Sequence, residues 1–309
     1  MSGAILAILN PTSGGGRATR HWWRLRRTIE THFPHLVVHQ TAGIGDAARR
    51  AAEWGRSGQT GAIVIVGGDG TIHEVVNALA VAGTPVPLGV IPSGTGNDFA
   101  RNAGIPLDPD LAAERLVQDA GRRLDLGRLR FRQPDGEERS VVFVNSTSVG
   151  VSPAANRYAQ RLGPFLPGRL CYVTGGVAAL LTQPRRRFTV TEAGRTVHQG
   201  KTLNITIANG AEFGGGMRIS PDSSAWDGVL ERVIIGEVGL GRALLAFSRL
   251  RQGAHIGMPE VTVETLTGET TIEADGAFHV EADGHDYVAE GPLTVSVEVG
   301  ALRVLGAGG

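Results

Sequence analysis

The sequence predicts an α/β domain with a parallel sheet, followed by an antiparallel β-sandwich. Over roughly the first 130 of the 309 residues, continuous apolar segments alternate with segments of helical periodicity. Unbroken apolar strands between helices are typical of a parallel sheet that is covered on both faces. From Leu124 onward, strand-like segments separated by short turns dominate, for example around Pro134, Asp135 and Gly136. Many strands joined by short turns favour an antiparallel sandwich.

The amino-terminal elements follow from the apolar pattern. Trp22, Leu25, Ile29 and Phe33 recur at helical spacing and would share the buried face of one helix. We expect strands at residues 4–9, 36–40, 62–66 and 88–91, and helices at residues 17–33, 46–54 and 71–81.

The carboxyl-terminal half is expected to be mostly strand. The expected strands are residues 140–145, 188–192, 203–208, 230–235, 261–266, 269–273, 277–281 and 293–299, and the expected helices lie near residues 154–161, 170–181 and 241–251. The pattern changes near residues 127–130 without a long linker. A cleft between two packed domains is therefore the expected ligand site.

The composition is that of a globular protein and narrows the function classes. Basic and acidic residues balance at 30 each, which argues against a dedicated nucleic-acid binder. Cys171 is the single cysteine, so an intrachain disulfide and a CxxC metal motif are excluded. The amino terminus lacks a basic segment before its short apolar run, and the apolar stretch at about residues 170–181 is too short for a membrane span. We expect a cytoplasmic protein that meets any membrane from its surface.

Three glycine-rich loops follow three of the expected strands. They are residues 10–16 (NPTSGGG), 67–71 (GGDGT) and 92–98 (PSGTGND), and they match neither GxGxxG nor GxxxxGK[ST]. Parallel strands bring such loops to one edge of the sheet, where ligands bind. Successive glycines let backbone N–H groups converge on an anion, and the following helix adds its positive end. The loops therefore indicate a phosphate site, and the carboxylate of Asp69 within them favours Mg²⁺ as a companion ion.

Further motifs accompany these loops along the chain. In the first half they are Thr41 with GDA at 45–47, EVVN at 74–77 and FAR at 99–101. In the second half they are NG at 209–210, GGM at 215–217, Pro221, DG at 227–228, DG at 283–284 and GALRV at 300–304. The whole set resembles the diacylglycerol kinase and sphingosine kinase superfamily, in particular its soluble bacterial lipid kinase branch. The resemblance extends from residue 10 to residue 304, and the series NPTSG, GGDGT and GTGND is far more specific than GGDGT alone.

The resemblance implies a Rossmann-like, three-layer ATP-binding domain at residues 1–128, joined by a closing strand at about 300–309. It implies a β-sandwich domain for the lipid substrate and a metal at residues 129–299, with the active site in the cleft between the domains. The implied nucleotide-binding residues are Asn10, Thr12, Ser13, Thr41, Gly67, Gly68, Asp69, Gly70, Thr71, Glu74, Thr95 and Asn97. The implied Mg²⁺ site combines the Asp227 carboxylate with the backbone carbonyls of Ser224 and Val229, and Asp69 and Asp98 would join Asp227 in an acidic network. Residues 223–228 also have the composition of a turn before a strand, and the two interpretations are compatible.

The implied reaction is transfer of the γ-phosphate of ATP to the hydroxyl of a lipid, with diacylglycerol as acceptor and phosphatidic acid as product. The resemblance places the general base in the last aspartate–glycine pair before the closing GALRVL segment, about twenty residues upstream. The sequence EADG occurs twice: Asp283 precedes Leu302 by 19 positions and Asp275 precedes it by 27. Asp283 therefore fits the base, and Asp275 with Gly276 is predicted to form a hairpin turn.

Three positions depart from the family pattern. His285 follows the second aspartate–glycine pair, where relatives usually have glutamate, so either His285 or Asp286 would have to replace that group. Arg17 could supply the charge of a lysine that some relatives carry in the first glycine loop, or it could simply be solvated. His73 replaces a common asparagine and is interpreted as a hydrogen-bonding residue rather than a catalyst.

A lipid kinase must also reach a membrane surface. Arg17, Arg20, Arg24 and Arg27 form a basic stripe on one expected helix, which could contact anionic headgroups or face solvent. Other candidate patches are residues 165–166, 170–181 and 185–187. The partners expected are a lipid at a membrane surface and no nucleic acid, and a homodimer is left open. Two alternative functions remain: a soluble-metabolite kinase of the NAD kinase type, and a non-catalytic nucleotide- or lipid-binding regulator.

Overall fold

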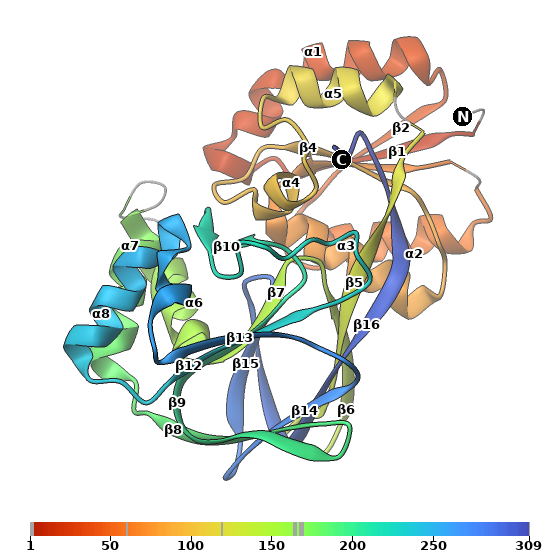
Figure 1. Cartoon of the computed structure of the whole chain (residues 1–309). Coiled ribbons are helices and arrows are strands. Elements are labelled where there is room, and N and C mark those ends of the chain that lie inside the picture. Colours follow the sequence, from red (N-terminus) through yellow and green to blue (C-terminus); the bar gives the residue numbers. More distant parts are fainter. Residues whose placement is uncertain (1–2, 60, 119, 163–165, 167–169, 309) are drawn as a thin grey trace. The chain divides into compact units, whose positions relative to one another are not determined.

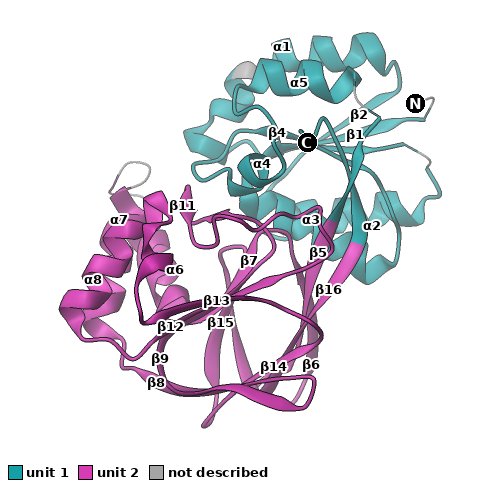
Figure 2. Ribbon diagram, viewed as in Figure 1, with its two compact units in different colours: residues 1–124, 300–309 teal, residues 125–299 magenta. Residues whose placement is uncertain are grey.

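The computed structural model describes residues 3–59, 61–118, 120–162, 166 and 170–308, and the chain divides into two compact units (Figures 1 and 2). Unit 1 lies within residues 1–124 and 300–309, and unit 2 comprises residues 125–299. Strands β5 (Arg122–Arg132) and β16 (His285–Leu305) each run from one unit into the other. The boundary predicted after residue 128 falls inside β5, where no change of composition marks the division found in the structure.

Unit 1 is built on a parallel sheet in the order β2–β1–β3–β4–β16. Its complete strands are β1 (Ile5–Leu9), β2 (Leu36–Gln40), β3 (Ile63–Gly67) and β4 (Leu88–Pro92). Every residue of β1, β3 and β4 is buried, as expected for parallel strands covered on both faces. Only the end of β16 joins this sheet, where Val304 and Leu305 pair with Leu88 and Gly89.

Helices cover both faces of the unit 1 sheet, so the predicted three-layer α/β fold is confirmed (Figure 1). They are α1 (Arg17–His32), α2 (Asp46–Arg56), α3 (Asp69–Ala82), α4 (Asp98–Asn102) and α5 (Pro109–Gln118), with a short 3₁₀ helix at Ser13–Gly15. Leu25, Ile29 and Phe33 of the predicted helix face pack in one core cluster with strand residues, and Trp22 lies against it. Helices α4 and α5 were not predicted.

In unit 2 the strands are antiparallel and their pairing closes on itself. The order β9–β7–β15–β16–β14–β8 returns to β9, because β9 and β16 are long and pair with different neighbours along their lengths. Beyond this ring, β12 and β13 extend from β9, and β6 pairs with β5. The remaining bounds are β6 (Glu138–Phe143), β7 (Ser146–Gly150), β8 (Arg186–Glu192), β9 (Arg195–Ala208), β10 (Glu212–Phe213), β11 (Met217–Arg218), β12 (Glu231–Gly236), β13 (Val261–Thr265), β14 (Thr270–Ala274) and β15 (Phe278–Ala282). The predicted β-sandwich is confirmed.

Aromatic side chains fill the interior of unit 2. Phe188 and Phe278 meet edge to face with ring centroids 5.8 Å apart, and Phe131 meets Tyr287 in the same way at 5.9 Å. The helices are α6 (Val151–Leu162), α7 (Leu170–Thr182) and α8 (Leu240–Arg249), followed by 3₁₀ turns at Leu250–Gln252 and Ala254–Gly257. In the described ranges, no helix combines the length and the apolar character needed to cross a bilayer.

His255 in the second 3₁₀ turn is a completely buried histidine. Its Nε2 lies 3.1 Å from the carbonyl oxygen of Ile219, and burial lowers the pKa of the imidazole. A second histidine, His198, also has a pKa lowered by burial.

Acid is therefore expected to destabilise unit 2. The folded-state pKa of His255 lies below its ordinary value near 6.5, so the unfolded chain binds more protons as the pH falls through that value, and stability is lost below it. The His255→Gln variant keeps an N–H donor for the Ile219 carbonyl but does not titrate. Between pH 7.5 and 5, the unfolding free energy of this variant should fall less than that of the wild type. Urea denaturation across this pH range measures the difference, and parallel curves for the two proteins would contradict it.

Candidate functional site

The three glycine-rich loops of unit 1 lie at one edge of its sheet. Strands β1, β3 and β4 are neighbours with parallel register, and each loop begins where its strand ends. Helix α3 starts at Asp69, directly after Gly67 and Gly68, so its positive end is turned to this edge. The nucleotide-binding residues predicted in these loops are thus brought together within unit 1.

Two of the loops touch through glycine backbones. A Cβ atom on Gly68 would lie 2.9 Å from the Cα of Gly94, and one on Gly94 would lie 2.6 Å from the Cα of Gly68. The first loop approaches as closely, since a Cβ on Gly14 would lie 2.1 Å from the carbonyl oxygen of Ser93. Only glycine permits such close approach between the loop backbones. This close approach explains why the loops are rich in glycine better than turn geometry alone does.

Asn10 joins the first loop to the second. Its Nδ2 donates to the Thr71 hydroxyl at 2.9 Å, while its Oδ1 accepts from the Thr12 backbone N–H at 3.1 Å and the Thr12 hydroxyl at 2.9 Å. Ser13 beside them is buried, whereas Gly70 and Thr95 are exposed at the loop tips. The exposed tips are the groups most accessible to a phosphate.

The acidic residues Asp69 and Asp98 flank Gly96. A Cβ on Gly96 would lie 2.9 Å from Asp69 Oδ2 and 3.5 Å from Asp98 Oδ2. The backbone N–H of Phe99 donates to Asp69 Oδ1 at 3.0 Å, and Arg101 pairs with Asp98 at 3.3 Å. Two carboxylates side by side are a negatively charged pair, and the Arg101 guanidinium offsets part of this charge.

Asn97, Thr41 and Glu74 were predicted to bind nucleotide, and the structure shows that two of them hold the loops. Asn97 accepts from the Gly94 N–H at 2.9 Å and donates to the Gly94 carbonyl at 3.1 Å, while its own backbone is left-handed at φ 55°. Glu74 accepts from the Gly45 N–H at 3.1 Å. Thr41 is buried at the end of β2. Shaping the loops is thus one role of Asn97 and Glu74 that the sequence did not indicate.

The loop before α2 contains a further carboxylate. The hydrogen bond from the Ala42 N–H to Asp46, together with Arg49 and His39, lowers the pKa of Asp46 to about 2. Asp46 is therefore ionised throughout the physiological range.

Arg17 has a defined partner. Its guanidinium donates to the carbonyl oxygen of Gly94 at 3.0 Å, so the side chain links the start of α1 to the loop after β4. His73 is buried in α3, and its carbonyl oxygen accepts from Asn77 at 3.0 Å.

In unit 2, Asp283 forms a tight turn with Gly284 and is held by main-chain donors. Asp283 and Gly284 have φ values of 47° and 83°, as in the two-residue hairpin turn that favours this dipeptide. Asp283 Oδ2 accepts from the Val144 N–H at 2.8 Å, and Oδ1 accepts from the N–H groups of Asn145 at 2.8 Å and Ser146 at 3.3 Å. These three amides orient the predicted base.

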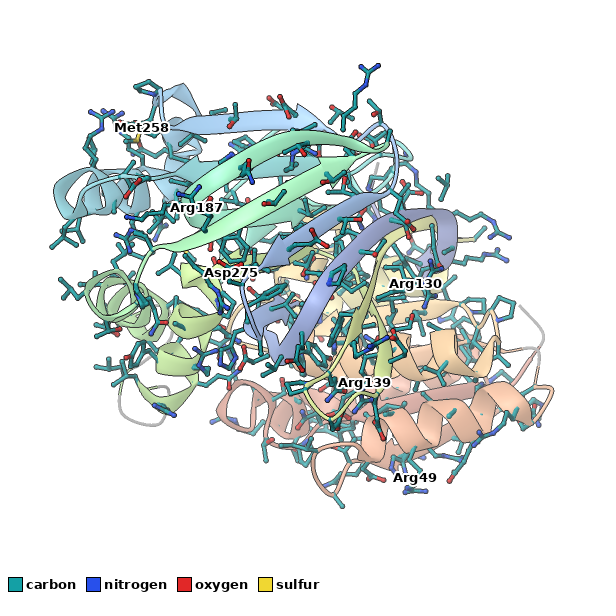
Figure 3. All side chains as sticks on the ribbon, turned by 90° about the horizontal axis from the view of Figure 1, so that it is seen from below. Arg49, Arg130, Arg139, Arg187, Met258 and Asp275 are labelled. Atoms are coloured by element: carbon teal, nitrogen blue, oxygen red, sulfur yellow. The ribbon has the colours of Figure 1, made fainter. Side chains whose placement is uncertain are left out.

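The other copy of EADG lies in an exposed turn between β14 and β15. Asp275 is solvent-exposed, as is Gly276, whose φ is 64° (Asp275 is labelled in Figure 3). The carbonyl oxygen of Asp275 accepts a hydrogen bond from the Arg186 guanidinium. The prediction of a turn at Asp275 is confirmed, but Asp283 is also in a turn, so the difference between the copies is burial and hydrogen bonding.

Strand β15, before Asp283, does not keep the alternation of buried and exposed side chains typical of a half-buried strand. Phe278, Val280 and Ala282 are buried and His279 is exposed, but Glu281 is also buried. The Oε1 atom of Glu281 accepts from the Gly284 N–H at 2.9 Å, so this carboxylate is hydrogen-bonded to the backbone of the Asp283 turn.

Helix α6 holds the residues that follow Asp283. Arg157 of α6 donates to both carboxylate oxygens of Asp286, at 3.0 and 3.1 Å, and His279 Nδ1 lies 3.0 Å from Asp286 Oδ2. Asn156 and Gln160 of the same helix donate to the Gly284 carbonyl. These contacts fix the carboxylate of Asp286 just beyond the turn.

The predicted metal loop, residues 224–229, is irregular backbone within unit 2. Asp227 is exposed and its Oδ1 accepts from the Val229 N–H at 3.1 Å, while Gly228 has φ 82°. The buried Asp125 accepts from the Gly228 N–H at 2.7 Å. Asp125 was not predicted, because nothing in the local pattern around it distinguishes it from other strand residues.

The donor set of this loop fits Mg²⁺. Burial raises the pKa of Glu231, and the charges of Asp227 and Asp222 raise it further, so the surroundings of the loop are negative. Among the described residues, no three His, Cys, Asp or Glu side chains are grouped for a metal. The predicted set of one carboxylate and two main-chain carbonyls needs no such group, and oxygen ligands are those that Mg²⁺ prefers.

A cavity of about 540 Å³ borders this loop within unit 2. Gly228, Val229 and Leu230 line it together with residues 265–269, Ser296 and Val297. The carboxyl-terminal side of the loop is therefore accessible to small solutes.

Two family models match the chain. The diacylglycerol kinase catalytic domain matches residues 4–129, and the YegS C-terminal NAD kinase beta sandwich-like domain matches residues 145–306. The protein is therefore a kinase that uses ATP and an alcohol acceptor, and the chain belongs to the diacylglycerol kinase family of lipid kinases.

Full-length relatives and solved structures agree with this assignment. A "Diacylglycerol kinase" of Mycobacterium tuberculosis is 30% identical over 98% of this chain and 95% of its own length. A protein of Pseudomonas aeruginosa named "Probable lipid kinase YegS-like" is 33% identical over 97% and 93%. The crystal structure of a diacylglycerol kinase from Bacillus anthracis has a TM-score of 0.73 at 20% identity, covering 98% of this chain and 96% of its own. Yeast NADH kinase shares the fold at a TM-score of 0.50 and 10% identity, so the fold alone does not define the acceptor.

The contact between Gly68 and Gly94 can be tested by adding one methyl group. The φ of Gly68 is −113°, which alanine adopts readily, so Gly68→Ala tests the close approach and not backbone strain. We expect the dissociation constant for ATP to rise at least about tenfold, or ~1.4 kcal/mol, because the two loops must separate. Isothermal titration with ATP measures this. Gly268→Ala is the matched control, since an added Cβ there has nothing within 4 Å. Wild-type affinity in Gly68→Ala would show that the loops need not touch.

Proposed function

We propose that this protein transfers the γ-phosphate of ATP to the hydroxyl of diacylglycerol in a Mg²⁺-dependent reaction that yields phosphatidic acid. The observation that carries the proposal is the joined glycine edge of unit 1, where backbone contact between Gly68 and Gly94 closes three loops around the start of α3. The acceptor is proposed from the names of full-length relatives.

The nucleotide phosphates would be bound by unit 1. Phosphoryl transfer requires little covalent chemistry from a protein and depends on positioning and on neutralising charge. Gly70 and Thr95 offer exposed backbone and hydroxyl groups at the edge, and Asn10 holds Thr71 and Thr12 in place behind them. The positive end of α3 favours the negative phosphates.

Asp227 and the carbonyls of Ser224 and Val229 would hold Mg²⁺ in unit 2, with Asp69 and Asp98 as acidic groups on the nucleotide side. When bound, Mg²⁺ supplies positive charge that the phosphate oxygens and these carboxylates require. The irregular backbone of residues 224–229 and the exposed Asp227 carboxylate on it support this assignment.

Asp283 would orient the acceptor hydroxyl and take its proton as the new bond forms. A lipid hydroxyl is a very weak acid, so the proton moves late in the transition state and an ordinary carboxylate is sufficient. The amides of Val144, Asn145 and Ser146 support this role, since they fix the carboxylate before substrate arrives.

Replacement of the base separates chemistry from nucleotide binding. Asp283→Asn is expected to lower the rate of lipid phosphorylation by about 10²–10⁴-fold, because the amide cannot accept the proton. ATP affinity should stay within twofold, since Asp283 lies in unit 2 and the nucleotide loops lie in unit 1. Transfer of ³²P from ATP into lipids, into NAD and into no acceptor measures the rate and the acceptor class together.

The second EADG copy provides the matched control. Asp275→Asn changes the same residue type before the same glycine, but in an exposed turn, and should retain wild-type activity. Lipid phosphorylation that persists in Asp283→Asn would remove the base assignment. Phosphate incorporation into NAD alone would replace the lipid acceptor with a soluble one, and no incorporation at all would favour a non-catalytic regulator.

We also propose that helices α7 and α8 dock on anionic membranes. Helix α7 contains no charged residue, and its side chains Leu170, Val173 and Leu181 are exposed by 54%, 47% and 61%. Helix α8, which packs on α7, exposes Leu240, Leu244 and Leu245. Four exposed arginines lie in or close to these helices in the sequence: Arg161, Arg187, Arg249 and Arg251. Apolar side chains with nearby positive charge suit the surface of an anionic bilayer.

The basic stripe on α1 supports membrane docking less well. Arg24 pairs with Asp110 at 2.5 Å, and the guanidinium groups of Arg17 and Arg20 donate to backbone carbonyls of unit 1. The other candidate membrane patch was residues 165–166, and of these Phe165 lies outside the residues that the structure describes.

Charge placed on the exposed side of α7 should weaken membrane binding. Leu170→Glu combined with Val173→Glu is expected to reduce binding to phosphatidylglycerol vesicles at least about tenfold, since losing ~1.4 kcal/mol of apolar burial is enough. Vesicle sedimentation measures the bound fraction. Val81→Glu is the control, because Val81 is 82% exposed on α3 of unit 1.

Two results would overturn this docking surface. Equal sedimentation with neutral and anionic vesicles would exclude recognition of anionic headgroups. A dimer in analytical ultracentrifugation that Leu170→Glu with Val173→Glu dissociates would assign the surface to a second copy of the chain.

A further inference from the structure

Helix α6 is hydrogen-bonded to the turn that carries Asp283, although none of its residues is assigned above to nucleotide, metal or proton transfer. Asn156 and Gln160 lie four residues apart, so their side chains share one face of the helix. Asn156 Nδ2 and Gln160 Nε2 both donate to the carbonyl oxygen of Gly284, the second at 3.0 Å. Two side chains of α6 therefore converge on the backbone of the residue next to Asp283.

Arg157 of the same helix holds the strand that leaves this turn. Its guanidinium donates to both carboxylate oxygens of Asp286, at 3.0 and 3.1 Å. Asp286 is the second residue of β16, which begins directly after the turn. Hydrogen bonds between charged groups are about twice as strong as those between neutral groups. Helix α6 thus holds the turn at the Gly284 carbonyl and the strand after it at Asp286.

The backbone of the turn needs such support. Asp283 has φ 47°, a left-handed conformation that residues with a side chain adopt at an energetic cost. Such a conformation persists where the surrounding structure holds it in place. The N–H of Gly284 donates to Glu281 at 2.9 Å, and its carbonyl accepts from α6. Both polar backbone groups of Gly284 are therefore bound by side chains, from β15 on one side and from α6 on the other.

Backbone contact with α7 sets the position of α6. A Cβ atom on Gly175 of α7 would lie 2.7 Å from the carbonyl oxygen of Ala155 and 2.7 Å from the backbone nitrogen of Ala159. Ala155 and Ala159 directly precede the two donors, Asn156 and Gln160. The two backbones are too close for a side chain to separate them, and closely packed interiors transmit displacement. A shift of α7 toward α6 therefore moves both donors.

We propose that Asn156, Arg157 and Gln160 are positioning residues for the turn that carries the proposed base. The contact at Gly175 sets the distance of these side chains from the turn. This rests on the proposed function, in which Asp283 takes the proton of the acceptor hydroxyl. Main-chain amides fix the carboxylate, and α6 fixes the backbone that carries it. Misplacing a reacting group by about 1 Å can cost ~10²-fold in rate, so a loosened turn lowers the rate of transfer without weakening nucleotide binding.

Removal of the two amide donors tests the role directly. Asn156→Ala combined with Gln160→Ala should lower kcat about 10–100-fold, because the turn is no longer held at the Gly284 carbonyl. Dihexanoylglycerol is the acceptor, a short-chain diacylglycerol that dissolves without a bilayer, so membrane docking does not enter the rate. KM for ATP should stay within about twofold, since the nucleotide loops lie in unit 1. Arg157→Lys keeps the charge but not the planar guanidinium, and it should retain more of kcat than Arg157→Ala.

A double-mutant cycle distinguishes positioning from general support of the fold. In the Asp283→Asn background there is no base left to position, so the same pair of alanine changes should lower the remaining rate by less than about twofold. A full further loss in this background would show that Asn156 and Gln160 act on something other than the base.

Gly175→Ala tests the contact between α6 and α7 without altering a residue that touches the turn. Alanine is favoured over glycine inside a helix, so α7 itself is not weakened, but the added methyl group forces the two backbones apart. We expect kcat to fall about tenfold with KM for ATP unchanged. Gly176→Ala is the matched control, because the Cβ added there would meet the Phe247 ring of α8 rather than α6. That variant should keep the wild-type kcat for the soluble acceptor.

The possible failures are distinguishable. If the wild type phosphorylates no diacylglycerol, the proposed function fails, and the positioning role fails with it. If the wild type is active and Asn156→Ala with Gln160→Ala retains its kcat, only the positioning role is overturned. An equal loss in Gly176→Ala, or a loss that matches the unfolded fraction in circular dichroism at the assay temperature, would assign α6 a merely structural role.

Discussion

The backbone contact between Gly68 and Gly94 is the constraint on which unit 1 depends. Adjacent parallel strands lie about 4.8 Å apart, so loops that leave neighbouring strands toward the same ligand must pass at backbone distance. Side chains at these positions would occupy the space that each loop needs. Asn97 and Arg17 then add hydrogen bonds to the backbone of Gly94, so that the loop is held by side chains that face the protein. The resulting edge presents backbone and hydroxyl groups without rearrangement when an anion binds.

Unit 2 holds carboxylates away from full contact with solvent, which disfavours their charge. The half-buried Asp283 and the buried Asp125 both accept hydrogen bonds from main-chain amides. Backbone N–H groups carry no side-chain freedom of their own, so they orient a carboxylate without the side-chain entropy that a lysine or arginine would lose. Asn209 fixes two of the Asp283 donors in turn. Its side chain binds the Val144 carbonyl and its backbone N–H binds the Asn145 carbonyl, and these carbonyls share peptide groups with the N–H groups of Asn145 and Ser146.

In the proposed function the two units divide the chemistry, with the phosphates at the glycine edge of unit 1. Yeast NADH kinase shares the fold at a TM-score of 0.50, so the fold by itself does not fix the acceptor. On this proposal, the acceptor would be selected by unit 2. The uncharged helix α7, with exposed Leu170 and Leu181, is the part of unit 2 that the proposed membrane docking would use.

The sequence by itself determined the parallel strands of unit 1 and its helices α1, α2 and α3, and that three glycine loops share one edge. Unbroken apolar runs and helical spacing report burial locally, and parallel register follows from them. The sequence also distinguished the predicted base Asp283 from Asp275, because the two residues lie 19 and 27 positions before Leu302 of the closing segment. Only the tertiary structure decided that Asn97 and Glu74 bind their own loops, that Glu281 is buried, and that main-chain amides and helix α6 hold the Asp283 turn. Those outcomes depend on hydrogen-bond partners as many as 139 residues apart, as between Val144 and Asp283, and local periodicity carries no information about which distant donor a polar side chain will meet.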